Sequence, residues 1–261
     1  MRNVILEKFK KGIPSIGTIT HLQSASVVES MGVTGLDFIF LDMEHCPVGI
    51  HEINTYLSAA DAAQITPIVR VGERSRSAVL RVLDAGAKGV VVPCIETVEQ
   101  VRELVQYAKF KPIGDRGYCM TRDGKWGFDA IYTDGMNGYM QTCNRETMLI
   151  PQCETVGCLE HIEEITAMDG VDGILIGPYD LSIGMGLDGQ FDHPDFQRAL
   201  ERILQACKTN GKLAMVFVGN ENDIADKLKD GFDSILYGID ILSVIAHYRG
   251  VVEKFHTITE R

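Results

Sequence analysis

The sequence predicts an α/β fold, a TIM (β/α)8 barrel formed by one domain over residues 1–261. Three observations predict it. Eight short apolar segments recur along the chain and alternate with amphipathic segments of helical periodicity. Most of the apolar segments are continuous runs of Val, Ile and Leu, which is typical of parallel strands covered on both faces. With 261 residues and a hydrophobic content of 45%, the chain is large enough to bury the core of such a barrel.

Taken in order, each strand-like segment precedes a segment with helical periodicity, as the repeating βα units of a barrel require. A doubly wound open sheet is the alternative fold, but no Gly-x-Gly-x-x-Gly follows the first strand. The expected strands are residues 16–20, 38–42, 67–71, 89–94, 149–153, 173–176, 213–218 and 234–237. The expected helices include residues 24–31, 79–84, 98–108, 159–168, 196–208 and 223–229.

One connection is longer than the others. Residues 111–148 are rich in Gly, Asp, Asn and Tyr and contain the only tryptophan of the chain, Trp126. A connection of this length in a compact domain is usually a lid or a binding loop. It leaves the fourth helix and enters the fifth strand, so it begins at the amino-terminal end of the barrel. To act as a lid it must extend or wrap around the barrel to the catalytic end. We therefore expect a long insertion before strand five that acts as a lid.

Charge and composition exclude several classes of partner. The net charge of −11 argues against binding to nucleic acid or to an anionic membrane surface. The first 11 residues lack the apolar core of a signal peptide, and no run approaches the roughly 18 apolar residues of a membrane span. The seven cysteines are odd in number, and Cys94 and Cys153 lie in predicted strands. We therefore expect reduced thiols in a cytoplasmic protein, without a structural zinc site.

Two carboxylates follow neighbouring predicted strands, Glu154 after strand five and Asp180 after strand six. In a parallel barrel the carboxyl ends of all strands open onto the catalytic face, so these two acids are expected to converge. Oxygen ligands of this kind suit a hard divalent cation such as Mg²⁺ or Mn²⁺. The alternative is one helix N-cap and one surface carboxylate.

Three polar side chains, Asp42, Glu44 and His45, stand at the end of strand two. Histidine titrates near neutral pH, so His45 is the expected general acid or base; the alternative is a histidine that caps the following loop. Asp42 and Glu44 are expected to orient the imidazole or the waters of a metal ion. Arg70, at the end of strand three, has the planar fork that binds a substrate carboxylate or an enolate oxygen.

Strand five adds Gln152, whose side chain points the same way as that of Glu154 because directions alternate along a strand. Together, a cation held by two carboxylates, an arginine and a histidine can stabilise an enolate and move one proton. Such a set supports aldol cleavage or condensation, and decarboxylation of an oxo acid. No lysine ends a predicted strand, which disfavours a Schiff-base aldolase, and neither a Walker motif nor Gly-x-Ser-x-Gly is present.

Five motifs, in order and with their spacing intact, resemble the HpcH/HpaI aldolase family over nearly the whole chain. Members of that family are class II, metal-dependent pyruvate aldolases, such as 4-hydroxy-2-oxoheptanedioate aldolase and 2-dehydro-3-deoxyglucarate aldolase. The motifs are residues 42–45 (DMEH), 67–71 (PIVRV), 83–87 (LDAGA), 152–155 (QCET) and 170–182 (GVDG to IGPYDLS).

The resemblance implies a TIM barrel in which Glu154 and Asp180 are ligands of Mg²⁺, Mn²⁺ or a similar ion such as Co²⁺ or Zn²⁺. It implies that pyruvate chelates this metal through its carboxylate and keto oxygens. Arg70 would stabilise the enolate, and His45 would act as acid or base on the aldol hydroxyl group, through a metal-bound water. The residues implied to line the pyruvate site are Gln152, Gly177 and Pro178.

The resemblance also pairs the catalytic histidine with an aspartate, and Asp84 is the matching position. Asp84 ends a predicted helix that runs away from the catalytic face, so in its own barrel it should lie about 20 Å from His45 by helix rise. We therefore expect Asp84 either to act across a subunit interface or to be a helix-end surface carboxylate.

Near the end of the chain, residues 239–255 carry a broad apolar stripe of helical periodicity. In the family this last helix is exchanged between the subunits of a homohexamer built as a trimer of dimers. The alternative is a helix that packs against its own barrel. The stripe consists of Ile241, Leu242, Ile245, Tyr248, Val252 and Phe255.

The main departure from the family lies in the long connection. Residues 114–118 match the start of a family motif, but Cys119 stands where the commoner members have glycine, and the segment through Trp126 and Asn137 resembles neither of the two aldolases. This region shapes the pocket for the acceptor aldehyde, so the pyruvate half of the substrate is predicted and the aldehyde stays open. The alternative functions are an acyl-CoA lyase of the citrate-lyase or malyl-CoA-lyase type and a non-catalytic barrel that binds an oxo acid.

Overall fold

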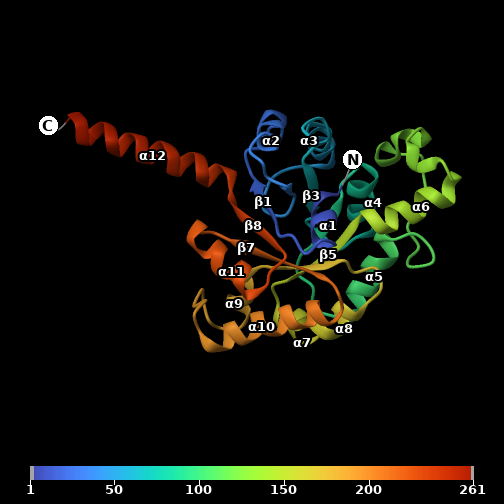
Figure 1. Cartoon of the computed structure of the whole chain (residues 1–261). Helices are drawn as coiled ribbons and strands as arrows, with labels where there is room; N and C mark the ends of the chain where they lie inside the picture. The colour runs from blue at the N-terminus through green and yellow to red at the C-terminus, as the bar shows by residue number, and fades with distance from the viewer. Residues whose placement is uncertain (1–2, 260–261) are drawn as a thin grey trace.

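The computed structural model describes residues 3–259 and shows a closed barrel of eight parallel strands surrounded by helices (Figure 1). Each strand pairs with the next along the chain, and β8 pairs with β1 to close the sheet. The prediction of a TIM barrel is therefore confirmed. The strands are β1 Ser15–Thr20, β2 Phe38–Asp42, β3 Thr66–Arg70, β4 Gly89–Val92, β5 Met148–Cys153, β6 Gly173–Ile176, β7 Leu213–Val218 and β8 Ser234–Ile239.

All eight predicted strands are present, and one difference in their bounds bears on the site. The sequence predicts that the fourth strand runs to Cys94, whereas β4 ends at Val92. Cys94 has a φ of 54°, which lies in the left-handed region that extended strands do not use. The chain therefore turns sharply beyond β4, and Cys94 belongs to the loop at the carboxyl end of the strand.

Two sets of apolar side chains build the core. An inner set, which includes Phe40, fills the barrel, and an outer set, which includes Ile39, packs between the strands and the helices. The two sets alternate along each strand because successive side chains point to opposite faces. Helix α1 (Val4–Phe9), which the sequence analysis did not predict, adds Ile5 and Leu6 to the inner set and closes the amino-terminal end of the barrel.

The helices cover the outside of the barrel, and local sequence signals explain where several of them begin. Thr97 and Gln100 form a reciprocal capping box at the start of α5, with the Thr97 side chain accepting from the Gln100 N–H. The predicted helix 159–168 is in fact two short helices that meet at His161. The remaining helices are α2 Ala25–Gly32, α3 Ile50–Ala62, α4 Arg76–Asp84, α5 Val98–Ala108, α6 Gly135–Glu146, α7 Val156–Glu160, α8 Ile162–Ala167, α9 Pro178–Gly184, α10 Pro194–Thr209, α11 Ile224–Asp230 and α12 Asp240–Thr259.

The long connection stays at the amino-terminal end of the barrel, so the expectation of a lid over the chain's own catalytic face is wrong. It contains α6 and two short 3-10 helices, η1 (Arg122–Gly127) and η2 (Ala130–Tyr132). The Arg122 guanidinium donates to the carbonyl of Ala85, 2.9 Å away, just beyond the end of α4. Helix α6 then leads almost directly into β5 and lies on the opposite side of the molecule from α12 (Figure 1).

A buried cluster of charged and aromatic side chains fixes this connection to α4. Arg116 makes ion pairs with Asp84 (2.7 Å) and Asp123 (3.2 Å), and its own side chain is almost fully buried. Tyr139 donates a hydrogen bond to Asp123, and its ring stacks on Tyr132 with 4.5 Å between the ring centroids. The contact between Arg116 and Asp84 joins residues 32 positions apart in sequence, which is why the position of the connection could not be predicted from local patterns.

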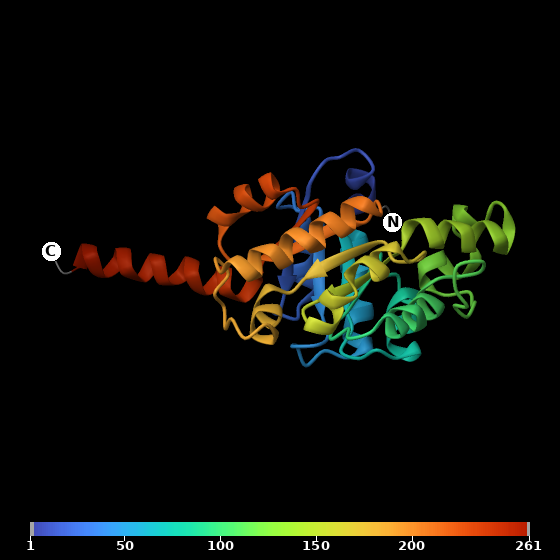
Figure 2. The same ribbon diagram turned by 90° about the horizontal axis from the view of Figure 1, so that it is seen from below.

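Helix α12 leaves the barrel and projects away from it (Figures 1 and 2), so it does not pack against its own barrel. Asp240, at its start, is the one residue of this helix that is buried. A stable monomer rarely exposes an apolar surface of this extent. Across residues 3–259, none of the helices combines the length and the hydropathy needed to cross a lipid bilayer. The exposed apolar side chains of α12 are Ile241, Leu242, Val244, Ile245, Tyr248, Val251, Val252, Phe255 and Ile258.

Candidate active site

Strand register brings Asp42 and Arg70 together at the carboxyl end of the barrel. Phe40 and Ile68 belong to the inner set, so the residues two positions later on β2 and β3 also point inward. Asp42 and Arg70 are register partners across these two strands. They therefore form the first polar layer above the apolar interior, and the Phe40 ring lies beneath the guanidinium, 5.5 Å from its central carbon.

The guanidinium of Arg70 is held in a fixed plane by two charge-assisted hydrogen bonds to Asp42. Arg70 Nε donates to Asp42 Oδ1 (2.9 Å), and Nη2 donates to Oδ2 (2.7 Å). Burial alone would raise the pKa of Asp42, but the hydrogen bonds and the charge of Arg70 hold it below its ordinary value. The remaining nitrogen, Nη1, lies 3.1 Å from Glu44 Oε2 in an ion pair.

Glu154 is a buried carboxylate at the end of β5, beside a second acid. Its Oε1 accepts a hydrogen bond from the Cys94 N–H (2.7 Å), and its Oε2 accepts one from Gln152 Nε2. Ligand atoms of Glu44, Cys94 and Glu154 all lie within 4.8 Å of one another. Burial raises the pKa of Glu44, Arg70 opposes this, and the nearby charge of Glu154 raises it further. The site therefore concentrates negative charge that a cation can neutralise.

The end of β6 lies directly against Glu154. A Cβ atom added to Gly177 would stand 3.0 Å from both Gln152 Nε2 and Glu154 Oε2, so this position is close to the carboxylate. Pro178 begins α9, which follows immediately, and Asp180 lies in its first turn with an exposed side chain. Within residues 3–259 no hydrogen bond joins Asp180 to Glu154. The structure places both acids at the carboxyl ends of neighbouring strands, Glu154 directly after β5 and Asp180 in the first turn of the helix that follows β6, and their convergence on one cation stays a prediction.

His45 and Asp84 lie apart in the single chain. His45 follows β2, its side chain is 63% exposed, and its Nε2 lies 3.9 Å from Glu44 Oε2. Asp84 is the last residue of α4, at the other end of the barrel, where Arg116 is its ion-pair partner. Burial raises the pKa of Asp84, and the hydrogen bond and charge of Arg116 oppose that effect.

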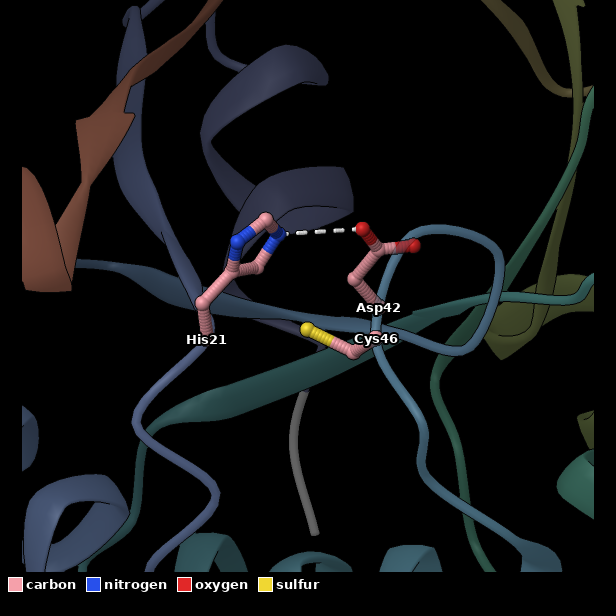
Figure 3. A group of neighbouring side chains, drawn as sticks. All are labelled: His21, Asp42 and Cys46. Atoms are coloured by element: carbon pink, nitrogen blue, oxygen red, sulfur yellow. Dashed lines mark hydrogen bonds and ion pairs between the residues drawn. The ribbon is translucent and has the colours of Figure 1, made fainter.

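Two residues that the sequence analysis did not assign to the site lie within it. His21 directly follows β1, and its Nε2 is 3.1 Å from Asp42 Oδ2 (Figure 3). Cys94 lies beside Glu154, and burial together with the charges of Glu154 and Glu44 raises the pKa of its thiol to about 11. His21 could have been found from its place immediately after a predicted strand, the signal that identified Glu154. Cys94 could not, because the strand was expected to continue through it.

The fold and these side chains define a barrel enzyme of the aldolase class, a carbon–carbon lyase. A family model described as HpcH/HpaI aldolase/citrate lyase matches residues 16–246, and the chain belongs to this family. The resemblance noted from five sequence motifs is therefore confirmed.

Individual relatives agree with this membership. The chain is 32% identical over 249 residues to a 2-keto-3-deoxy-L-rhamnonate aldolase of Klebsiella pneumoniae, a match covering 93% of this chain and 90% of the relative. It is 29% identical to a hydroxypyruvate/pyruvate aldolase of Roseobacter denitrificans, with 97% of each chain covered. The crystal structure of an HpcH/HpaI aldolase from Desulfitobacterium hafniense superposes with a TM-score of 0.89 at 28% identity and covers 96% of this chain and 95% of that one.

Proposed function

We propose that the chain is a divalent-metal-dependent aldolase that cleaves a 4-hydroxy-2-oxo acid to pyruvate and an aldehyde. The observation that carries the proposal is the Arg70 guanidinium, held by Asp42 at the mouth of the barrel close to the half-buried Glu44 and the buried Glu154. Cleavage breaks the bond between C3 and C4 of the oxo acid. The 4-hydroxyl group loses its proton, the aldehyde leaves, and the electron pair remains as an enolate that takes up a proton at C3.

The donor set fits a hard divalent cation. Glu154 and Asp180 would hold it, because they are oxygen donors at the ends of neighbouring strands. The raised pKa of Glu44, caused first by burial and then by the charges of neighbouring acids, supports a cation at this end of the barrel. Mg²⁺ or Mn²⁺ is the expected ion, with Co²⁺ or Zn²⁺ as alternatives. When bound, the metal would supply Lewis-acid stabilisation of negative charge on the substrate oxygens.

The residues of the chain then have separate tasks. Arg70 would stabilise the negative charge that develops on the 2-oxo oxygen, because its position is fixed before substrate binds. His45 would take the proton from the 4-hydroxyl group, and its exposed side chain leaves it free to reach a substrate. Asp42 and Glu44 would orient the guanidinium from two sides. The residues expected to line the pyruvate site are Gln152, Gly177 and Pro178, and the buried Gln152 Oε1 has no hydrogen-bond partner within residues 3–259.

We infer further that the complete site is shared between subunits of a cytoplasmic homohexamer, arranged as a trimer of dimers. The exposed apolar face of α12 supports an exchange of this helix between subunits. Asp84 could assist His45 only from a second subunit, because it lies at the amino-terminal end of its own barrel. Mixed oligomers of Asp84→Asn and His45→Ala chains test this inference. Recovered turnover supports a shared site, and no recovery in verified mixed oligomers refutes it.

The experiment that tests the activity is pyruvate release, coupled to lactate dehydrogenase, from a panel of 4-hydroxy-2-oxo acids. The names of the relatives suggest 2-keto-3-deoxy-L-rhamnonate for this panel, and an aldol adduct of hydroxypyruvate for a parallel assay that detects hydroxypyruvate instead of pyruvate. The protein is assayed after chelation, after addition of Mg²⁺ or Mn²⁺, and as the Glu154→Gln variant. Glu201→Gln, an exposed residue of α10, is the matched control.

Activity that metal restores and that Glu154→Gln alone abolishes supports the proposal. If metal binds and no oxo acid releases pyruvate, the proposal is wrong, and acyl-CoA substrates of the citrate-lyase type are then the next compounds to assay.

A further inference from the structure

His21 occupies a register position in the polar layer that holds Asp42 and Arg70. Thr20 pairs with Leu41 across β1 and β2, so the next residues, His21 and Asp42, lie side by side. Ile19 belongs to the inner set, and His21, two positions later, therefore points inward as well. The three polar residues form a row across three neighbouring strands at the mouth of the barrel.

The imidazole of His21 completes the hydrogen bonding of the Asp42 carboxylate. Oδ1 accepts from Arg70 Nε (2.9 Å) and from the Glu44 N–H (3.0 Å). Oδ2 accepts from Arg70 Nη2 (2.7 Å) and faces His21 Nε2 at 3.1 Å (Figure 3). An ionised carboxylate accepts but cannot donate, so His21 Nε2 must carry the proton in this contact. All of the roughly four acceptor positions of Asp42 are then used.

This arrangement excludes a cation among the three clustered side chains His21, Asp42 and Cys46, although their ligand atoms lie within 4.8 Å of one another. A metal ion would have to displace a hydrogen bond from Asp42, and the positive charge of Arg70 lies next to the same oxygen. The cluster is a hydrogen-bonded support for the carboxylate, and the thiol of Cys46 packs beside it.

The backbone that carries the imidazole is also fixed. The backbone N–H of His21 donates to Asp240 Oδ1 (2.8 Å), and Thr20 Oγ1 donates to Asp240 Oδ2 (2.6 Å). Asp240 is buried, so these bonds are shielded from water. The backbone that carries the imidazole is thus tied to a rigid point before any substrate binds.

We propose that His21 is a positioning residue for Arg70, acting through the carboxylate of Asp42. Without the imidazole N–H of His21, Asp42 has only the guanidinium and one backbone N–H as donors. The carboxylate and the guanidinium of Arg70 can then rotate together as a pair. When the imidazole N–H is present, donors from three directions fix the plane of the Asp42 carboxylate. The two hydrogen bonds to Arg70 then fix the plane of the guanidinium. This inference rests on the proposed function, in which Arg70 stabilises the developing enolate.

The test compares His21→Ala with His21→Gln in the full-length protein. Loss of a residue that orients a catalytic group typically costs about 10- to 100-fold in activity. We expect His21→Ala to lower kcat about tenfold with KM nearly unchanged. We expect His21→Gln to recover most of the loss, because its side-chain amide can donate to Asp42. Cys46→Ala, which removes volume beside Asp42 without removing a hydrogen bond to it, is the control and should retain kcat.

A double-mutant cycle with Arg70→Lys asks whether His21 acts through Arg70. In the Arg70→Lys background, His21→Ala should cost less than twofold, because the planar fork that it orients is absent. A full tenfold loss in that background, or a kcat of His21→Gln no better than that of His21→Ala, overturns the proposal.

One measurement is independent of turnover. In ¹⁵N-detected NMR, the Arg70 Nε–H signal should be protected from exchange with water in the wild type and in His21→Gln, and exchange faster in His21→Ala. If wild-type protein cleaves no oxo acid, the proposed function fails while this measurement still decides whether His21 fixes Arg70. Equal protection in all three proteins refutes the positioning role.

Discussion

Replacing Asp42 by asparagine tests how strongly the barrel mouth depends on its central ion pair. The substitution keeps the size of the side chain, removes its charge, and turns one acceptor oxygen into an NH₂ group that faces donors. The side chains of Asp42 and Arg70 are 0% and 10% exposed, so the pair is shielded from solvent. Breaking a buried pair by removing one partner costs about 3–5 kcal/mol. Glu44 still lies 3.1 Å from Arg70 Nη1, so we expect the lower end, about 3 kcal/mol.

The pH dependence of this loss follows from the pKa of Asp42. Burial opposes the shift, but the hydrogen bonds and charge of Arg70 lower the pKa below its ordinary value of 3.8. A carboxyl group with a lowered pKa contributes stability that is complete above the unfolded-state pKa, about 4, and that is lost as the pH falls through the lowered value. The difference between wild type and Asp42→Asn should therefore be constant from about pH 8 to pH 5 and shrink only below about pH 4.

Urea unfolding at fixed protein concentration measures this difference. Far-UV circular dichroism is the appropriate probe, because the only tryptophan, Trp126, lies exposed in η1 and does not report on the barrel. A loss below about 1 kcal/mol, or a difference that already changes between pH 8 and pH 5, would refute the reasoning. The first outcome would mean that the pair is no stronger than a surface ion pair.

Three further predictions concern neighbouring parts of the structure. Gly177→Ala should lower metal affinity at least several-fold without unfolding the protein, because the added Cβ stands 3.0 Å from Glu154 Oε2. Isothermal titration calorimetry with Mn²⁺ measures the affinity, and an unchanged value contradicts the prediction. At pH 8 a thiol reagent should modify exposed Cys119 faster than exposed Cys94, whose pKa is raised to about 11. Mass spectrometry of digested protein gives the rate at each cysteine, and faster modification of Cys94 contradicts the prediction. Arg116→Met should lower the thermal midpoint, because it leaves the buried carboxylate of Asp123 and the half-buried carboxylate of Asp84 without their cation. A midpoint equal to that of wild type argues against the cluster as an anchor.

The barrel could be predicted because the same sequence pattern, an apolar run followed by a helical segment, repeats along the chain. Eight apolar runs with helical segments between them indicate an eight-stranded barrel. An error at one boundary, such as the end of β4, does not change this topology. The same regularity locates residues at the carboxyl ends of strands, which is why Arg70 and Glu154 were found at the mouth.

What could not be predicted depends on contacts between distant residues. The insertion before β5 is held at the amino-terminal end by Arg116 and Asp84, which are 32 residues apart, and no local pattern records that pairing. The placement of Asp180 in the first turn of α9 depends on how that helix begins after Gly177, which strand periodicity does not determine. His21 was not predicted, although it directly follows the first predicted strand, because the polar residue at that strand end was not assigned to the site.

The side chain of Asp240 links the start of α12 to the end of β1. Its carboxylate accepts from the Ile241 N–H (2.7 Å) at the start of α12 and from the end of β1 at Thr20 and His21. In the proposed oligomer, a partner subunit that holds α12 would therefore restrain the backbone beside the row of polar residues at the mouth. Dilution that separates the subunits should thus lower turnover per chain while the circular dichroism of the barrel stays unchanged, so that the specific activity reports the dissociation constant of the oligomer.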